Sequence, residues 1–282
     1  MACIVVIYNP GKIFFDLLER LKNKDTITII IDNSEKKTDL ILDDSIYYHW
    51  MRKNCGIAKA QNQGIKLSEY YKSEYVVFLD QDSLLGFDNI SDLINVLENS
   101  DYSIVAPISV NRKTSNPYSP VKISKYGGVK KLPILDERII ETNFAISSGT
   151  VVEKTALDRI GTMDESLFID YVDTEWCIRA AKKGFKIAIN TQVEMVHEIG
   201  DGDINCYFFR VPVHSPQRRY YRVRNSFYLL KYKHVPIYLA IREILVTAIQ
   251  QLIIMIFKKN KYCYGRSYFK AVSDGIRYLF KN

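Results

Sequence analysis

Tyr75–Val76–Val77–Phe78–Leu79–Asp80–Gln81–Asp82–Ser83 is an apolar run of strand-forming residues that ends in two carboxylates. Side chains at i and i+2 of an extended segment point to the same side. We therefore expect Asp80 and Asp82 to converge while Gln81 points away. Two convergent carboxylates repel each other unless a cation lies between them, and Mg²⁺ or Mn²⁺ suits such an oxygen site. The alternative for these nine residues alone is a strand followed by an Asp-rich turn.

The segments around this stretch predict an open α/β sheet. Polar side chains follow three of the expected strands, at Asn9, Asp32 and Asp80/Asp82. In such sheets, ligands bind at the carboxyl ends of the strands. Apolar runs predict strands over 2–8, 26–31, 46–48, 75–79, 102–106, 146–152, 185–189 and 193–197. Helical spacing predicts helices over 13–23, 89–99 and 154–160, one that the segment 54–64 opens and that runs through about Tyr71, and one through Lys183 that Asp173 or Thr174 caps. Residues 111–138 are expected to be loops with short strands.

The composition of the 282-residue chain is that of a globular protein, with 47% hydrophobic and 25% charged residues. The five Cys residues form no CxxC pair. We therefore expect neither a disulfide framework nor a zinc site, and we expect the protein to reside in a reducing cytosol. The opening Met1–Ile7 segment predicts a strand and lacks a basic region, so we expect no secretory signal.

Charge divides the chain into two parts. Residues 214–282 contain 14 Lys and Arg against 2 Asp and Glu, a net charge of +12, whereas 1–213 carry a net charge of −5. We therefore expect a domain over 1–213 and a basic, aromatic helical extension over 214–282. A basic region favours an anionic partner.

The apolar stretch Ile237–Phe257 is expected to lie on a membrane rather than to cross it. A spanning helix needs about 20 apolar residues, and polar residues interrupt this one at Arg242, Glu243, Gln250 and Gln251. Lys258, Lys259 and Lys261 follow it, a pattern that favours a helix in an anionic membrane interface. The alternative is a helix packed on the body or at the seam of a homodimer.

Six motifs in this order resemble the family 2 inverting glycosyltransferases, and within them the bacterial rhamnosyltransferase-like branch. The resemblance covers about Met1–Asn225 and implies a GT-A fold, a nucleotide-sugar donor and Mn²⁺ or Mg²⁺. The motifs are Tyr8–Asn9–Pro10, Asp32–Asn33–Ser34, Asn54–Cys55–Gly56–Ile57–Ala58–Lys59–Ala60–Gln61–Asn62, Asp80–Gln81–Asp82, Ser147–Ser148–Gly149 and Phe168–Ile169–Asp170–Tyr171–Val172–Asp173–Thr174–Glu175–Trp176–Cys177–Ile178–Arg179.

The resemblance implies roles for the residues at the first three strand ends. Asp32 matches the residue that accepts from the pyrimidine base, with Tyr8 and Asn9 in the same pocket. Asp80 and Asp82 match the DxD pair that carries the metal, and Asp80 also approaches the ribose. The residues that match the segment along the nucleoside are Asn54, Lys59 and Asn62. The alternatives are turn-forming roles for Asp32 and Asn9 and a capped surface helix for the nucleoside segment.

The resemblance also implies a catalytic base, Asp173. The family's Glu-Asp pair is Val172–Asp173 here, so the neighbouring carboxylates of Asp170 and Glu175 stay open as alternatives. His197 matches a late His that approaches the metal or the pyrophosphate, and its alternative is a structural role. In the segment 217–225, Arg219 and Arg224 are expected to clamp a diphosphate. Arg218 and Arg222 are expected to form a solvated basic face.

We therefore expect a metal-dependent inverting glycosyltransferase that moves L-rhamnose from dTDP-rhamnose to a lipid-linked oligosaccharide. The expected setting is bacterial surface polysaccharide synthesis (O-antigen or capsule) on the cytoplasmic face of the cell membrane. One alternative is a UDP-hexose donor. Another is a nucleotidyltransferase, although Tyr8–Asn9–Pro10–Gly11–Lys12 is not a Gly-rich phosphate loop. A nucleic-acid-binding module leaves the aligned carboxylates unexplained, so we expect no nucleic-acid partner.

Overall fold

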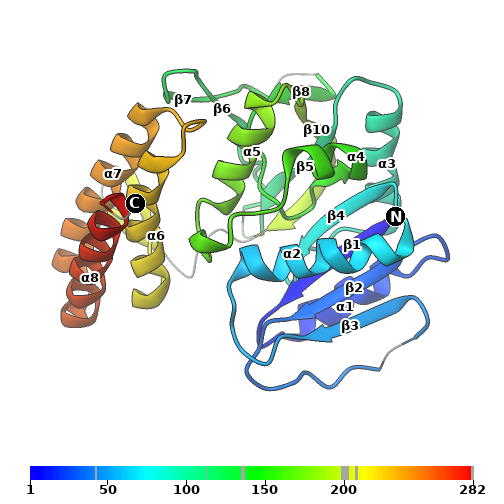
Figure 1. Ribbon diagram of the computed structural model, residues 1–282, viewed down its shortest axis with the longest axis horizontal. Helices are drawn as coiled ribbons and strands as arrows, with labels where there is room; N and C mark the ends of the chain where they lie inside the picture. The colour runs from blue at the N-terminus through cyan, green and yellow to red at the C-terminus, as the bar shows by residue number, and fades with distance from the viewer. Residues whose placement is uncertain (42, 113, 135–136, 198–202, 207–208, 281–282) are drawn as a thin grey trace.

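The expected alternation of strands and helices builds one eight-stranded sheet with helices on both faces (Figure 1). The structure is a computed structural model that describes residues 1–41, 43–112, 114–134, 137–197, 203–206 and 209–280. The strand order is β3-β2-β1-β4-β9-β5-β10-β8. The strands are β1 (Ala2–Ile7), β2 (Ile27–Asp32), β3 (Ile46–Trp50), β4 (Tyr75–Asp80), β5 (Ile104–Asn111), β8 (Ile139–Thr142), β9 (Val151–Glu153) and β10 (Ile187–His197).

The pairing of these strands fixes where the site lies. β1 pairs in parallel with β2 and with β4, and β2 pairs in parallel with β3. Their carboxyl ends therefore meet at one edge of the sheet. β9 is antiparallel to β4 and β5, and β8 is antiparallel to β10, while β5 and β10 are parallel. The sheet is mixed and mostly parallel, as expected.

Successive side chains of each strand point to opposite faces of the sheet, and they form two apolar layers, one on each face. On β1, Ile4 packs in the layer beneath α2 (Ile57–Ser68), α4 (Lys154–Ile160) and α5 (Val172–Lys182). Its neighbour Val5 packs in the opposite layer beneath α1 (Lys12–Leu21) and α3 (Phe87–Glu98). Helix α2 approaches so closely that a Cβ at Gly64 would overlap the Ile4 side chain. These layers hold the strands from which the polar loops project.

Three of the predicted strands differ from the observed ones. Residues 146–150 form a turn, and β9 begins only at Val151. The strands predicted over 185–189 and 193–197 are one strand, β10, whose register shifts between Asn190 and Glu194. Residues 111–138 contain the short hairpin of β6 (Val121–Ile123) and β7 (Val129–Lys131), as predicted. A second hairpin joins β11 (Asp203–Cys206) to β12 (Phe209–Pro212).

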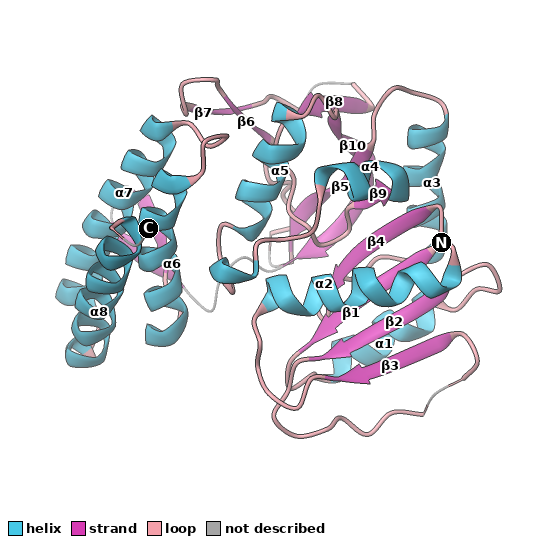
Figure 2. Cartoon of the chain, in the orientation of Figure 1, coloured by secondary structure: helices cyan, strands magenta, loops and turns pink. Residues whose placement is uncertain are grey.

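Three helices follow the sheet and form a layer beside α5 (Figure 2): α6 (Pro216–Tyr228), α7 (Ile237–Phe257) and α8 (Lys261–Leu279). They pack on the rest of the chain through an apolar cluster that includes Tyr171 and Ile178 near α5 and Leu239 and Ala240 on α7. This places the basic extension against the segment that carries the predicted base. The division at 213/214 stays a prediction.

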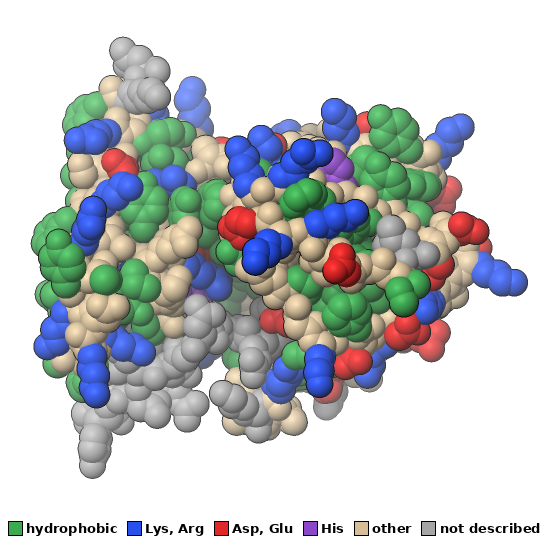
Figure 3. Space-filling view, turned by 90° about the horizontal axis from the view of Figure 1, so that it is seen from below, with side chains coloured by type: hydrophobic (Ala, Val, Ile, Leu, Met, Phe, Trp, Pro, Cys, Tyr) green, Lys and Arg blue, Asp and Glu red, His purple; other side chains and the backbone are tan. Residues whose placement is uncertain are grey.

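Helix α7 has an inverted arrangement of polar and apolar side chains. Its buried side includes Glu243, Thr247 and Gln251, spaced by one helical turn. Its exposed side is an apolar stripe of Ile241, Leu245, Ile249, Leu252 and Ile256. The helix is unbroken over 21 residues with mean hydropathy 1.8, which by length and composition is enough to cross a membrane. Figure 3 shows hydrophobic and basic side chains over these helices, whereas acidic ones gather over the sheet domain.

Candidate functional site

Asp80 is the last residue of β4, and the chain turns immediately after it. The Ser83 N–H donates to the Asp80 carbonyl at 3.1 Å. The i, i+2 argument was therefore wrong in its geometry, because Asp82 lies in this turn and not in the strand. The charge of Asp82 nevertheless acts on the Asp80 carboxylate. Burial raises the pKa of Asp80 to about 7, aided by the charges of Asp82 and Asp173 and opposed by Arg218.

This uncompensated negative charge suits a hard dication. Two carboxylates at a strand end supply part of its oxygen ligands, and substrate phosphates and water supply the rest. Among the residues that the structure describes, no group of three or more His, Cys, Asp and Glu is arranged as a metal site. The backbone of His197 pairs with Asn111 in the β10·β5 ladder, but its side chain lies outside what the structure describes. Asp80 and Asp82 thus fit the expected ion.

The turn 147–149 supports Asp80 from the neighbouring strand. The Asp80 N–H donates to Ser148 Oγ at 3.0 Å, and Ser148 Oγ also bonds Ser83 Oγ. Gly149 has φ +79°, and a Cβ there would lie 2.7 Å from atoms of Met195 and Pro107. Only glycine suits this conformation and this space. Side chains of the protein itself, Met195 and Pro107, therefore occupy the space beside this bend.

Asp173 lies in the first turn of α5, on the side of the acidic pair. Ser147 hydrogen-bonds its carboxylate through both backbone and side chain. Burial, with the charge of Asp170, raises its pKa, and the Ser147 bonds and Arg218 oppose that rise. The helix is capped by Tyr171, with φ 62°, so the predicted cap at Asp173 or Thr174 was wrong. The Asp173 side chain is free of capping, and its charge contributes to the raised pKa of Asp80.

The two alternative carboxylates are engaged elsewhere. Glu175 is buried, accepts from Arg179 at 2.8 and 2.9 Å, and lies 2.7 Å from Nε2 of His234. Asp170 lies 3.5 Å from the guanidinium of Arg218 and 3.6 Å from that of Arg222. Of the three candidates, Asp173 is therefore the one without an ion-pair partner within 4 Å among the described residues.

The arginines of α6 are arranged opposite to the prediction. Arg219 is buried and donates to Gln250 and to the Thr247 carbonyl of α7. Arg224 donates to the Ser166 and Leu167 carbonyls. Their diphosphate-clamp role is corrected, because each guanidinium is used to join α6 to neighbouring segments.

Arg218 and Arg222 instead face Asp170, and the charge of Arg218 reaches Asp80 and Asp173. They were predicted to be solvated. Their i, i+4 spacing was the signal for a shared face of α6, but the sequence did not indicate which face meets the site.

Asp32 organises the turn that follows β2. Its carboxylate accepts from the N–H groups of Ser34 and Thr38, each at 2.9 Å, and from the Tyr48 hydroxyl at 2.6 Å. Burial opposes its ionisation, but these hydrogen bonds outweigh burial and lower its pKa. The turn-forming reading therefore holds, and recognition of a base stays a prediction.

The ends of β1 and β4 are joined through Gln81. The Tyr8 N–H donates to Gln81 Oε1 at 2.7 Å. Asn9, with φ 47°, donates its N–H to Ser34 Oγ at 2.8 Å. Tyr8 is 42% exposed. Tyr8 and Asn9 thus lie at the same sheet edge as Asp80, while contact with a nucleoside stays a prediction.

The nucleoside segment on α2 is largely engaged within the protein. Asn54 Oδ1 accepts from Asn33 Nδ2 and from the Gly56 N–H. Asn62 exchanges two hydrogen bonds with the backbone of Met163, at 2.8 and 2.9 Å. Its predicted donor contact is corrected, because both ends of its amide hold the loop before α5. Lys59 lies 3.6 Å from Glu165 and is half exposed.

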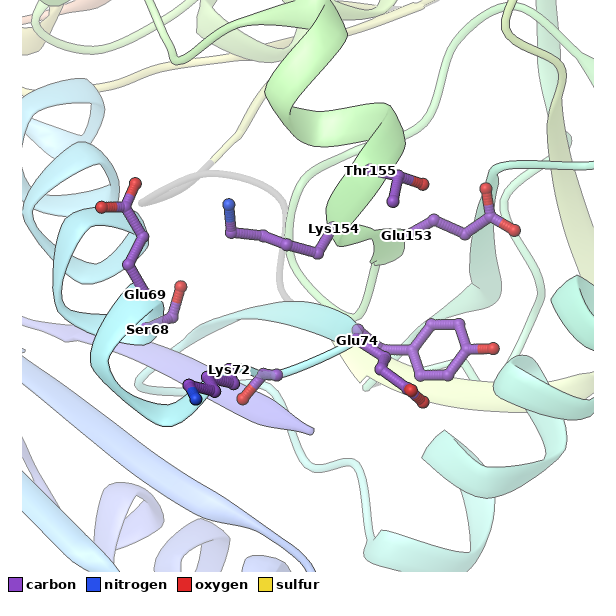
Figure 4. A pocket seen from close by; sticks show the side chains of 9 residues that line it. Ser68, Glu69, Lys72, Glu74, Glu153, Lys154 and Thr155 are labelled. Carbon is purple, nitrogen blue, oxygen red and sulfur yellow. The ribbon is translucent and has the colours of Figure 1, made fainter.

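The hollow in Figure 4 lies at the other end of β4. It is lined by Glu69, Lys72, Glu74, Tyr75 and Lys154 among others. Tyr75 begins β4 and Asp80 ends it, so this hollow is not the carboxylate site.

Comparisons with known proteins identify the family of this chain. The family model described as Glycosyl transferase family 2 matches residues 2–161. The dTDP-rhamnosyl transferase RfbF of Shigella flexneri is 38% identical over 279 residues, 97% of this chain and 94% of that protein. The structure of S. aureus TarS 1–349 in complex with UDP-GlcNAc gives a TM-score of 0.58 at 14% identity, covering 98% of this chain and 80% of that one. GalNAc-T7 with UDP, GalNAc and Mn²⁺ also gives 0.58, at 11% identity, covering 79% of this chain and 46% of that one. This chain therefore belongs to glycosyl transferase family 2, as a rhamnosyltransferase-like glycosyltransferase of the GT-A fold.

Proposed function

We propose that this enzyme transfers L-rhamnose from dTDP-rhamnose to a lipid-linked saccharide, with inversion at the anomeric carbon and with a bound Mn²⁺ or Mg²⁺. The convergence of Asp80, Asp82 and Asp173 at one sheet edge supports this most directly. It sets an acidic pair suited to a dication beside a separate carboxylate suited to a base. The donor is inferred from the likeness to RfbF along nearly the whole chain.

In the proposed reaction, Asp173 accepts the proton of the acceptor hydroxyl. The acceptor oxygen bonds the anomeric carbon as the bond from that carbon to the diphosphate oxygen breaks, and dTDP leaves. Burial raises the pKa of Asp173 and so strengthens it as a base. Arg218 adds positive charge toward the diphosphate. When bound at Asp80 and Asp82, with His197 as a further proposed ligand, the dication neutralises charge on the leaving group.

A donor panel tests this reaction. The protein is incubated with dTDP-rhamnose, UDP-glucose and UDP-GlcNAc, each with Mn²⁺ or with EDTA, and the released nucleotide is identified by mass spectrometry. We expect dTDP release that depends on Mn²⁺. Release of UDP alone would identify the hexose alternative, and the absence of release from every donor would contradict the proposed function.

The base is tested by Asp173→Asn, with Asp158→Asn on an exposed position of α4 as the matched control. We expect Asp173→Asn to lower kcat by about 10²–10⁴-fold, the usual contribution of a positioned base. Its Kd for dTDP-rhamnose, measured by calorimetry, should stay near the wild-type value. Loss of donor binding, or a control equally impaired, would point to another base.

We also propose that α7 rests on the anionic inner face of the bacterial membrane. Its apolar stripe is exposed, with Leu252 at 66% and Ile256 at 67%. Lys258, Lys259 and Lys261 follow it directly and suit acidic head groups. The inward polar residues favour a helix that lies on the membrane over one that crosses it.

Liposomes of phosphatidylglycerol test this surface. Replacing Ile249 and Leu252 by Lys removes two apolar contacts, each worth about 1.5–3 kcal/mol. We expect partitioning to fall at least 100-fold, whereas Phe15→Lys on α1 should leave it unchanged. If the wild type does not bind liposomes but sediments as a dimer, and the double variant sediments as a monomer, the stripe is instead a homodimer seam.

A further inference from the structure

A buried polar network joins α7 to the segment before the proposed base. The Tyr171 hydroxyl donates to Glu243 Oε2 at 2.8 Å. Arg222 lies between two acids, 3.6 Å from Asp170 and 4.0 Å from Glu243, with its guanidinium 5.3 Å from the Tyr171 ring centroid. Tyr171 and Glu243 are 9% and 8% exposed. Glu243 is the sole acidic residue of α7.

The segment that receives this network holds an unfavourable backbone conformation. Phe168, Asp170 and Tyr171 have φ values of 65°, 62° and 62°. Non-glycine residues with such φ angles cost of order 1–3 kcal/mol each and persist only where their surroundings enforce them. Asn225 donates to the Leu167 and Ile169 carbonyls, which restrains one end of the segment. Glu243 and Arg222 restrain the other end, two residues before Asp173.

We infer that Glu243 is a positioning residue for transfer: through Tyr171 and Arg222 it holds the segment 168–171 and thereby sets where Asp173 lies. A buried acid is costly in an otherwise apolar helix unless its partners compensate it. Here the partners are Tyr171, which lies two residues before the base, Arg222 of α6 and the adjacent Arg242 of α7. The inference rests on the proposed role of Asp173, and it assigns to α7 a part in the reaction as well as in attachment.

Glu243→Gln tests this inference, because it removes the charge and keeps the volume. Thr247→Val is the matched control: Thr247 is buried one turn further along α7, and its hydroxyl donates only to Ile244 of the same helix. With dTDP-rhamnose we expect Glu243→Gln to lower kcat about 10–100-fold, as small misplacements of catalytic groups do. The donor KM should change less than threefold. Tyr171→Phe should act similarly, and the double variant should be no worse than the poorer single one.

Amide hydrogen exchange of 168–172 provides a second measurement that needs no donor. We expect these amides to exchange at least tenfold faster in Glu243→Gln than in the wild type, and unchanged in Thr247→Val. If both variants exchange alike, Glu243 only fills the helix interface and the inference is overturned. Because exchange is independent of turnover, a failure of the proposed function would leave this test intact.

Discussion

Burial of the Asp80 carboxylate, aided by the charges of Asp82 and Asp173, should make Asp80 a source of instability in the metal-free enzyme. The pKa of Asp80 is raised from 3.8 to about 7 in the folded state. Between these values the folded state keeps a proton that the unfolded state releases, so the free energy of unfolding falls as pH rises through this window. At 1.36 kcal/mol per unit, about three units give at most about 4 kcal/mol. We take about 2–4 kcal/mol for this partly buried group.

Asp80→Asn should therefore stabilise the metal-free protein while it abolishes transfer. In EDTA at pH 8 we expect a higher melting temperature by on the order of 5–10 °C, and almost no difference at pH 4, where the wild-type carboxyl is protonated. Differential scanning calorimetry from pH 4 to 8 measures this, with exposed Asp16→Asn as control. Equal stabilities at pH 8, or a difference independent of pH, would refute the reasoning. Mn²⁺ should stabilise the wild type and not Asp80→Asn. At a Mn²⁺ concentration 100-fold above its Kd, the free energy of unfolding of the wild type should rise by about 2.7 kcal/mol.

Three further substitutions test neighbouring contacts. Arg218→Gln should lower kcat/KM for the donor by about 10–100-fold, since it removes a charge-assisted contact worth about 1.5–3 kcal/mol. Steady-state kinetics measure this loss, and an unchanged melting temperature would show that the variant is still folded. Gly149→Ala should lower the free energy of unfolding by about 2–4 kcal/mol through φ strain and overlap with Met195, measured in urea. Tyr48→Phe should raise the pKa of Asp32 and cost about 1 kcal/mol near pH 7. That loss should vanish as the pH falls and the Asp32 carboxylate becomes protonated. A carboxylate whose pKa is lowered by folding contributes stability only at pH values where it is ionised.

Periodicity predicted most of the sheet because buried strands and their helices carry a local signal. Ile4 and Val5 show why: alternate residues of β1 face different helical layers, so the whole strand is apolar. The prediction of strands was wrong where the backbone conformation of a single residue decides the structure. Residues 146–150 read as a strand but turn, because Gly149 takes a φ that a strand excludes.

The candidate site was predictable where chemistry sits at strand ends and not where it depends on helix orientation. Asp80, Asp82 and Asp173 could be placed together from sheet topology and resemblance. Arg218 and Arg219 are adjacent in sequence and differ only in direction, so the choice between them depends on how α6 packs against α7. That packing is a tertiary property, and the sequence of α6 alone does not contain it.

The proposed role of Glu243 makes the C-terminal helices part of the catalytic structure. The family match ends at residue 161, yet Asp173 and the groups that restrain its loop lie beyond it. Deleting 237–282 would remove the exposed apolar stripe together with Glu243, and it would uncover the cluster around Tyr171. A truncated enzyme that lost both liposome binding and activity would not distinguish anchoring from positioning. Outward substitutions at Ile249 and Leu252 and the inward substitution at Glu243 separate them, because the two faces of α7 touch different partners. We expect the outward pair to retain kcat on a water-soluble acceptor, and the inward one to lose it while still bound to liposomes.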